Sequence, residues 1–377
     1  MLSVPWINTG LTGRPVLALA VAGAVLPVVA VAWLARRGTN GVPTGRSMSG
    51  WRARSVLTRV VPMVVLVLCA QLFAMTALAL RVNDVYLFYT SWADLFGQVS
   101  QGSAIQTGGL VGQGQGAVRL MTVPSGDTGS QHQVLVWLPP EYSLPRYRDH
   151  HFPVVLFLTG QPSTPQTAFR HFSFARKAME AINSQHVPPF VAVFPTLMIS
   201  PPRDTECTDV PGGPKAETWL ARDVPRFVTE HFRVGRPGKA WTTMGWSTGG
   251  FCSAKLVTSH PGEFGSAVAF GGYFQPVEDT TTGSLFGGRK RLALHNSPAW
   301  LYEHRGGLRG SRMLLIAGQQ DKQTWRATSQ MIRIAAGDPS VAHIAFPQGG
   351  HNYRNYASYL PDALAWAAQG WPTGSHQ

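Results

Sequence analysis

The sequence predicts an α/β fold, in which a mostly parallel β-sheet carries helices on both faces, preceded by two transmembrane helices. Three observations predict it. Two long uncharged stretches lie near the N-terminus, short apolar runs alternate with helical patterns from residue 130, and a G-x-S-x-G sequence joins one such run to a helix. We therefore divide the 377 residues into a membrane anchor (1–83), a linker with an early hairpin (84–129) and a large α/β domain (130–377).

The two uncharged stretches, residues 15–35 and 60–80, are each long enough to cross a hydrocarbon core of about 30 Å as a helix. The connection between them contains no acid and six arginines: Arg36, Arg37, Arg46, Arg52, Arg54 and Arg59. This asymmetry predicts a cytoplasmic connection, with the N-terminus and the large domain outside the cell membrane. In the alternative interpretation residues 15–35 are a cleaved signal peptide, but the basic connection would then lie outside, against the positive-inside bias.

The formal net charge of +13 comes largely from the anchor, because residues 1–83 hold eight arginines and no acid. The remaining residues carry +5. Such an excess is compatible with anionic lipid or a cell-envelope polymer nearby, and it lacks the runs of Lys and Arg interleaved with aromatics that indicate nucleic-acid binding. We therefore expect a membrane protein that does not bind nucleic acid.

The three cysteines are compatible with this topology. Cys69 lies in the second span, where it acts as a small apolar residue. Cys207 and Cys252 belong to the large domain, where disulfides persist if it lies outside, and the sequence leaves both a disulfide and two buried thiols open. No Cys-x-x-Cys or paired-His spacing accompanies them, so we expect no metal site.

Short apolar runs bounded by turn residues predict strands at residues 134–138, 154–158, 190–194, 240–244, 267–270, 313–316 and 341–345. Helical spacing predicts helices at residues 217–232, 251–259, 321–336 and 353–368. Apolar strands that alternate with helices form mostly parallel sheets covered on both faces. Catalytic groups gather where the strands of such sheets end.

The G-x-S-x-G sequence is Gly245-Trp246-Ser247-Thr248-Gly249, between a predicted strand and a predicted helix. This context predicts a nucleophile elbow, a sharp turn that exposes a serine hydroxyl. Glycines flank such a serine because side chains two positions away would collide. The turn also directs the N–H of Thr248 toward a developing oxyanion. The alternative interpretation is an ordinary strand-to-helix loop that contains a serine.

A nucleophilic serine needs a base, and the base needs an orienting acid. His351 follows the last predicted strand in a Gln-Gly-Gly-His loop, and we predict it as the base. Asp321 follows the strand at 313–316 and is our predicted acid, although it could be only an N-cap, with Asp338 and Glu303 as fall-backs. His260 ends the helix after Ser247, and we interpret it as a helix-end residue.

An oxyanion hole requires a second N–H, from a loop that faces the elbow. The loop after residues 154–158 provides Gln161 as the candidate, with Gly160 as the near alternative, because Pro162 has no N–H. An ordinary Gly-Gln-Pro turn is the competing interpretation.

Two further features are open. Residues 204–209 hold three acids, and we prefer a structured rim loop to a cation site because the spacing matches no known calcium loop. Trp246, Tyr353 and Tyr356 either line an apolar pocket beside Ser247 or belong to the core.

Four segments, residues 159–161, 217–220, 245–250 and 351–360, together resemble the esterase D / antigen 85 (mycolyltransferase) branch of the α/β-hydrolases. The resemblance covers residues 130–370 and looks closest to membrane-anchored esterases of actinobacteria. It implies an α/β-hydrolase fold and a triad of Ser247, Asp321 and His351. It also implies an oxyanion hole formed by the backbone of Thr248 and Gln161, without a cofactor.

The sequence departs from the antigen 85 pattern at two points. Residues 161–165 replace a segment that contains Asp and Arg in antigen 85 members and handles the sugar, and the acid is Asp321 where the family often has Glu. We therefore predict an extracytoplasmic, membrane-anchored serine esterase that acts on an ester or lipid substrate through an acyl-enzyme. Two alternatives remain: transfer of the acyl chain to a sugar or lipid hydroxyl of the cell envelope, and a catalytically inactive surface-binding module.

Overall fold

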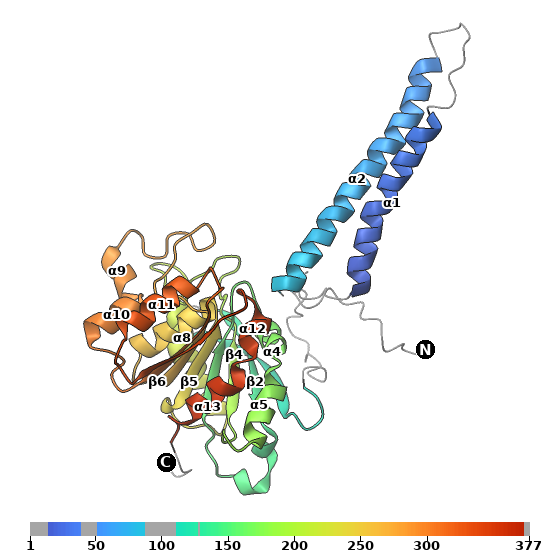
Figure 1. The fold of residues 1–377 in the computed structure, drawn as a ribbon. Helices are drawn as coiled ribbons and strands as arrows, with labels where there is room; N and C mark the ends of the chain where they lie inside the picture. The colour runs from blue at the N-terminus through green and yellow to red at the C-terminus, as the bar shows by residue number, and fades with distance from the viewer. Residues whose placement is uncertain (1–13, 39–50, 87–110, 127–128, 373–377) are drawn as a thin grey trace. The chain divides into compact units, whose positions relative to one another are not determined.

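The computed structural model describes residues 14–38, 51–86, 111–126 and 129–372. The chain forms two compact units, residues 1–99 and 100–377. The first unit contains a helical hairpin and the second contains a single sheet with its helices (Figure 1).

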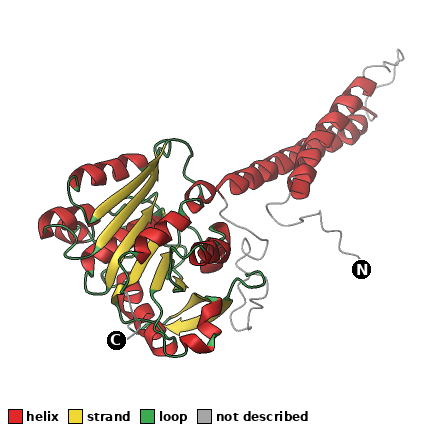
Figure 2. Cartoon of the chain, turned by 60° about the horizontal axis from the view of Figure 1, so that its bottom comes forward, coloured by secondary structure: helices red, strands yellow, loops and turns green. Residues whose placement is uncertain are grey.

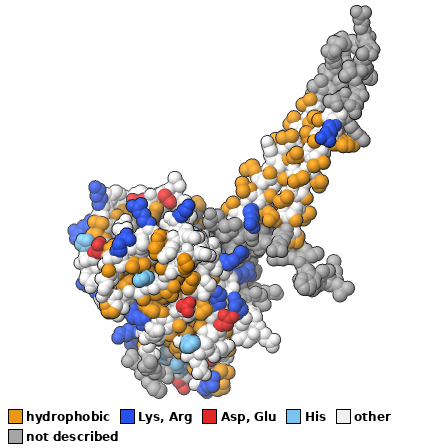
Figure 3. Space-filling model, viewed as in Figure 1, with side chains coloured by type: hydrophobic (Ala, Val, Ile, Leu, Met, Phe, Trp, Pro, Cys, Tyr) orange, Lys and Arg blue, Asp and Glu red, His pale blue; other side chains and the backbone are white. Residues whose placement is uncertain are grey.

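The helical hairpin consists of α1 (Arg14–Gly38) and α2 (Trp51–Tyr86). The helices approach closely at Gly23, where an added Cβ would lie 2.6 Å from the Phe73 ring. Most of the other apolar side chains point outward and cover the helices (Figure 3). The stretches Pro15–Arg36 and Val60–Val82 are long and apolar enough to cross a membrane. Residues 39–50 of the predicted basic connection lie outside the described residues.

The sheet has eight strands in the order β1-β2-β4-β3-β5-β6-β7-β8. Strands β3 to β8 run parallel, while β2 pairs antiparallel with both β1 and β4. The strand bounds are β1 Ala117–Pro124, β2 Gln131–Leu138, β3 Val154–Leu158, β4 Val191–Pro195, β5 Gly238–Trp246, β6 Phe264–Phe270, β7 Arg312–Gly318 and β8 Val341–Phe346. Because β3 and β4 are buried at every position, they form the apolar centre of the domain.

Helices cover both faces of the sheet (Figures 1 and 2). One face carries α8, with α10 packed on it and α11 against β7, and the other carries α4, α5, α12 and α13. The helix bounds are α4 Pro165–His171, α5 Phe174–Asn183, α6 Ala216–Thr218, α7 Val224–His231, α8 Thr248–Ser259, α9 Lys290–His295, α10 Pro298–Arg305, α11 Trp325–Ile334, α12 Tyr353–Ala357 and α13 Leu360–Ala368.

All seven predicted strands are present, and β1 is an additional strand within the segment interpreted as a linker and early hairpin. The predicted helix at 217–232 is formed by α6, a π-helical turn over Trp219–Asp223, and α7. The predicted helix at 353–368 is broken between α12 and α13, where Pro361 lacks the N–H that would continue α12. The helix predicted from residue 321 begins only at Trp325, after a turn.

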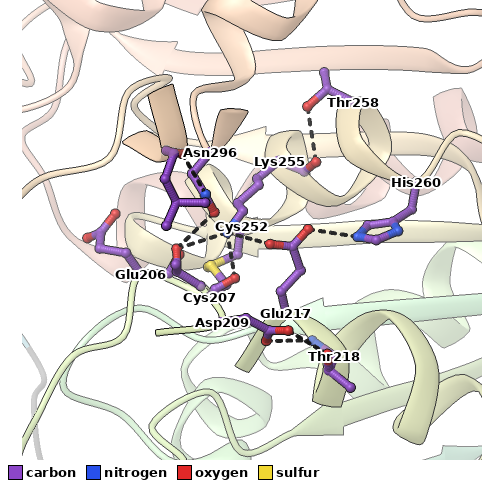
Figure 4. A network of polar contacts seen from close by, with 12 residues as sticks. Glu206, Cys207, Asp209, Glu217, Thr218, Cys252, Lys255, Thr258, His260 and Asn296 are labelled. Carbon is purple, nitrogen blue, oxygen red and sulfur yellow. Dashed lines mark hydrogen bonds and ion pairs between the residues drawn. A yellow bond between two sulfur atoms is a disulfide. The ribbon is translucent and has the colours of Figure 1, made fainter. Parts of the chain in front are cut away.

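A buried polar network ties the loop after β4 to α8 (Figure 4). Cys207 in this loop forms a disulfide with Cys252 in α8. The ammonium group of Lys255, fully buried one turn further along α8, donates to the Cys207 carbonyl (2.7 Å) and the Thr208 hydroxyl (2.9 Å). Its charge is balanced by Glu217, 3.0 Å away.

Glu217 also contacts His260 at 2.8 Å (Figure 4). Burial alone would raise the pKa of Glu217, but the charge and hydrogen bonds of Lys255 and His260 outweigh burial and lower this pKa to about 2. Glu217 is therefore ionised at neutral pH. Its carboxylate compensates a buried ammonium that would otherwise be costly to keep in the interior.

We predict that Glu217→Gln lowers the free energy of unfolding by about 3 kcal/mol, because it leaves the buried Lys255 charge uncompensated. Glu180→Gln is the matched control, since its pair with Arg176 is half exposed and is expected to contribute about 0.5 kcal/mol or less. Urea unfolding of the detergent-solubilised chain, followed by tryptophan fluorescence, measures both. Equal losses in the two variants would contradict the prediction.

Candidate active site

The G-x-S-x-G sequence forms the turn between β5 and α8. Ser247 stands between the two elements with φ 59° and ψ −120°, a left-handed conformation that is strained for any residue except glycine. Two contacts stabilise it: the Ser247 N–H donates to the Phe270 carbonyl (2.9 Å), and the Ser247 carbonyl accepts from the Gly250 N–H (2.9 Å). The strain and its compensation match the predicted nucleophile elbow.

The two glycines of the motif permit backbone approaches that no other residue allows. A Cβ at Gly245 would lie 2.3 Å from the Gly249 carbonyl oxygen. A Cβ at Gly249 would lie 2.1 Å from the Leu158 carbonyl oxygen and 2.6 Å from that of Thr159. The first turn of α8 therefore packs directly on the end of β3 and on the loop that follows it.

The structure brings Ser247, His351 and Asp321 together. His351 Nε2 is 2.8 Å from Ser247 Oγ, and His351 Nδ1 is 2.7 Å from Asp321 Oδ2. The carboxylate is fully buried and the imidazole is 9% exposed, so water has little access to either contact. Each residue follows the carboxyl end of a different strand: Ser247 follows β5, Asp321 follows β7, and His351 follows β8.

Besides His351, several other groups donate hydrogen bonds to the Asp321 carboxylate. Its Oδ2 also accepts from the hydroxyls of Tyr356 (2.5 Å) and Thr324 (2.8 Å), and its Oδ1 accepts from the N–H groups of Gln323 and Thr324. Asp321 is not the N-cap of α11, which is Thr324, but its side chain accepts hydrogen bonds within the turn that precedes this helix. Burial alone would raise the pKa of Asp321, but the charge of His351 and these side-chain hydrogen bonds lower it to about 2.

The fall-back acids lie elsewhere. Asp338 accepts from the Tyr302 hydroxyl (2.6 Å) and from the Ser340 N–H, and Glu303 is exposed on α10. His260 pairs with Glu217, in agreement with its interpretation as a structural residue at the end of α8.

Aromatic rings support the imidazole. The Trp246 ring stacks on His351 with centroids 4.7 Å apart, and Tyr353 packs on Trp246 at 3.9 Å. Trp246, Tyr353 and Tyr356 are all buried, which favours the core interpretation for these three residues. Trp246 and Tyr356 nevertheless act on the site, the first by stacking on the base and the second by its hydrogen bond to Asp321.

The two backbone groups predicted for an oxyanion hole belong to segments in contact. Thr248 is the first residue of α8, where an N–H has no acceptor within the helix. Gln161 follows Gly160, whose Cα lies so close to the Trp246 ring that an added Cβ would be 2.5 Å from it. The loop that carries Gln161 therefore packs against the residue that precedes the nucleophile.

The acidic loop is structured. Asp204 and Glu206 are buried, and Asp209 accepts from the N–H and hydroxyl of Thr218. Among the residues that the structure describes, no group of three His, Cys, Asp or Glu side chains could hold a metal ion.

Sequence reasoning missed Thr324 and Tyr356 as partners of Asp321. Thr324 stands three residues after Asp321, which is the spacing of a capping turn, and this spacing could have predicted their contact. Tyr356 carries no comparable signal, because its contact depends on how α12 packs against the end of β7.

The family model described as "Putative esterase" matches residues 125–370, more than half of the chain. The chain belongs to the Esterase family. This confirms the predicted resemblance to esterases and supports a carboxylic-ester hydrolase, whereas the antigen 85 part of the resemblance stays a prediction.

An uncharacterized protein of Corynebacterium glutamicum is 26% identical over 244 residues, which are 60% of this chain and 56% of that protein. The chain thus spans little more than half the length of this curated relative.

Three solved structures share the fold of this chain. A ferulic acid esterase is 17% identical with a TM-score of 0.59, over 68% of this chain and 99% of that one. An S-formylglutathione hydrolase from Agrobacterium tumefaciens is 18% identical with a TM-score of 0.58, over 73% and 99% of the two chains. A fluorophosphonate-binding serine hydrolase of Staphylococcus aureus is 17% identical with a TM-score of 0.56, over 67% and 98%. These similarities confirm the predicted α/β-hydrolase fold.

We predict that Gly249→Ala destabilises the esterase domain by more than about 3 kcal/mol, because the new methyl group would meet the Leu158 carbonyl, and neither backbone can move without disturbing β3 or α8. Gly262→Ala is the control, since a Cβ there meets nothing within 4 Å. Thermal unfolding of both purified variants provides the measurement. A Gly249→Ala variant as stable as Gly262→Ala would show that the turn is not closely packed.

Proposed function

We propose that the protein is a membrane-anchored serine esterase, whose C-terminal unit cleaves carboxylic esters on the extracytoplasmic side through an acyl-enzyme. The observation that carries the proposal is the continuous hydrogen-bonded chain from the Ser247 hydroxyl through His351 to Asp321, set at a strained strand-to-helix turn. Membership of the Esterase family and the shared fold with serine hydrolases support it.

In the acylation step, His351 Nε2 removes the Ser247 proton as Oγ attacks the ester carbonyl carbon. The imidazole becomes positively charged, and the Asp321 carboxylate, kept ionised by its low pKa, stabilises this charge and holds the ring. The carbonyl oxygen becomes an oxyanion that accepts hydrogen bonds from the N–H groups of Thr248 and Gln161.

Collapse of the tetrahedral intermediate breaks the bond to the alcohol, which leaves with the proton from His351. Water then attacks the acyl-enzyme, His351 takes the proton of this water, and a second collapse returns the proton to Ser247. The first and last proton transfers, between Ser247 and His351, pass over a contact that the resting geometry already contains, so the chain needs no large rearrangement to begin the reaction.

The placement outside the cell is supported by three features. The helices α1 and α2 carry stretches of 22 and 23 residues that are apolar enough to span a bilayer. The six arginines of residues 36–59 favour a cytoplasmic connection between the two helices. The Cys207–Cys252 disulfide favours an oxidising compartment for the catalytic domain.

We predict that Ser247→Ala abolishes both hydrolysis of p-nitrophenyl esters and labelling by a fluorophosphonate probe, because the hydroxyl is the proposed nucleophile. Ser329→Ala, which removes an exposed hydroxyl from α11, should keep both. The assay uses the detergent-solubilised chain and esters of increasing acyl length, with and without a sugar or glycerol acceptor. Residual turnover in the Ser247→Ala variant would overturn Ser247 as the nucleophile. A wild-type protein that neither hydrolyses the esters nor reacts with the probe would favour a binding module. Faster turnover in the presence of the acceptor would indicate acyl transfer.

We also predict that an epitope tag at the C-terminus is digested when protease is added to intact spheroplasts, because the catalytic unit lies outside. The same tag placed in the connection between α1 and α2 should stay protected until the membrane is opened. Protection of the C-terminal tag would contradict the proposed topology and favour the signal-peptide interpretation.

A further inference from the structure

The loop after β4 is held against the first two turns of α8. Glu206 and Cys207 both adopt left-handed backbone conformations, with φ of 48° and 47°. Cys207 is bonded to Cys252, and its carbonyl accepts from Lys255, so two positions of α8 fix this short segment (Figure 4). The Glu206 side chain is consequently buried, with 2% of its surface exposed.

Tyr273 connects this loop to the residue after the nucleophile. It lies just beyond the end of β6, and its ring stacks on Phe251 of α8 with centroids 4.9 Å apart and an angle of 9°. Its hydroxyl is 2.5 Å from Glu206 Oε1 and 3.4 Å from Thr248 Oγ1. A tyrosine hydroxyl has one proton, so when it donates to Glu206 it accepts from Thr248. The three side chains then form one directed chain.

Glu206 serves this chain as a largely neutral acceptor at pH 7. Burial raises its pKa to about 8, against the opposing effect of the hydrogen bond from Tyr273. The charged groups that act on it are Asp204, which raises this pKa further, and Lys255, which lowers it. Glutamine at this position would therefore keep both the charge state and the acceptor.

We propose that Glu206 and Tyr273 are positioning residues, which hold Thr248 so that its N–H points at the oxyanion. The proposal rests on the esterase function proposed above. The Thr248 hydroxyl and N–H belong to one residue at a strained turn, so fixing the hydroxyl restricts rotation of the adjacent peptide. Oxyanion donors stabilise the transition state only when they are already aligned, and small misplacements cost much of the rate.

The test measures kcat and KM for p-nitrophenyl acetate, together with thermal stability, in the detergent-solubilised chain. Tyr273→Phe keeps the stacking on Phe251 and removes only the hydroxyl, and we expect a kcat about tenfold lower with KM within about twofold. Glu206→Leu should lower kcat as much as Tyr273→Phe does. Glu206→Gln, which keeps a neutral acceptor, should have a kcat near the wild-type value. Tyr302→Phe is the control, because its hydroxyl contacts Asp338 away from the site.

The double variant Tyr273→Phe/Glu206→Leu should lose no more kcat than either single variant, because both changes break one chain. An active wild type whose kcat survives Tyr273→Phe, or losses that multiply in the double variant, would overturn the positioning role while the esterase function stands. Equal losses in Glu206→Gln and Glu206→Leu would also overturn it. A wild type without esterase activity would overturn both proposals.

Discussion

The close approach of two backbones, at Gly249 on α8 and at the Leu158 carbonyl that ends β3, is the constraint on which the candidate active site depends. It sets the first turn of the helix on the sheet and brings the loop of Gln161 beside the nucleophile. The same packing forces Ser247 into a left-handed conformation, at a cost of order 1–3 kcal/mol. Hydrogen bonds from the turn to β6 and within α8 offset that cost, so the strained serine persists.

Two buried acids near this turn show how environment decides protonation. Asp321 accepts hydrogen bonds from two hydroxyls and faces His351, and its pKa falls to about 2. Glu206 has one hydroxyl donor and the charge of Asp204 nearby, and burial raises its pKa to about 8. At neutral pH the first is a charged partner for an imidazolium and the second a neutral acceptor, so similar side chains serve opposite electrostatic purposes.

The architecture was largely predictable from the sequence, because apolar runs of strand length alternate with helical patterns and strongly restrict the fold. The seven predicted strands are present for this reason. The differences lie at places that local patterns encode weakly: β1 lies in the segment interpreted as a linker and early hairpin, and it forms the edge strand of the sheet beside β2. α11 begins at Trp325 rather than at residue 321, and the side chain of Asp321 accepts hydrogen bonds from Gln323 and Thr324 in the turn before it.

By itself, the sequence determined the order of elements, the strand-to-helix turn at Ser247, and the positions of Asp321 and His351 just after strands, since these depend on local composition and spacing. Only the tertiary structure decided which side chains meet. The contacts of Tyr356 with Asp321, of Tyr273 with Glu206 and of Cys207 with Cys252 each join residues from separate elements. They depend on how helices and loops pack across the sheet, and no short-range pattern in a single sequence records that packing.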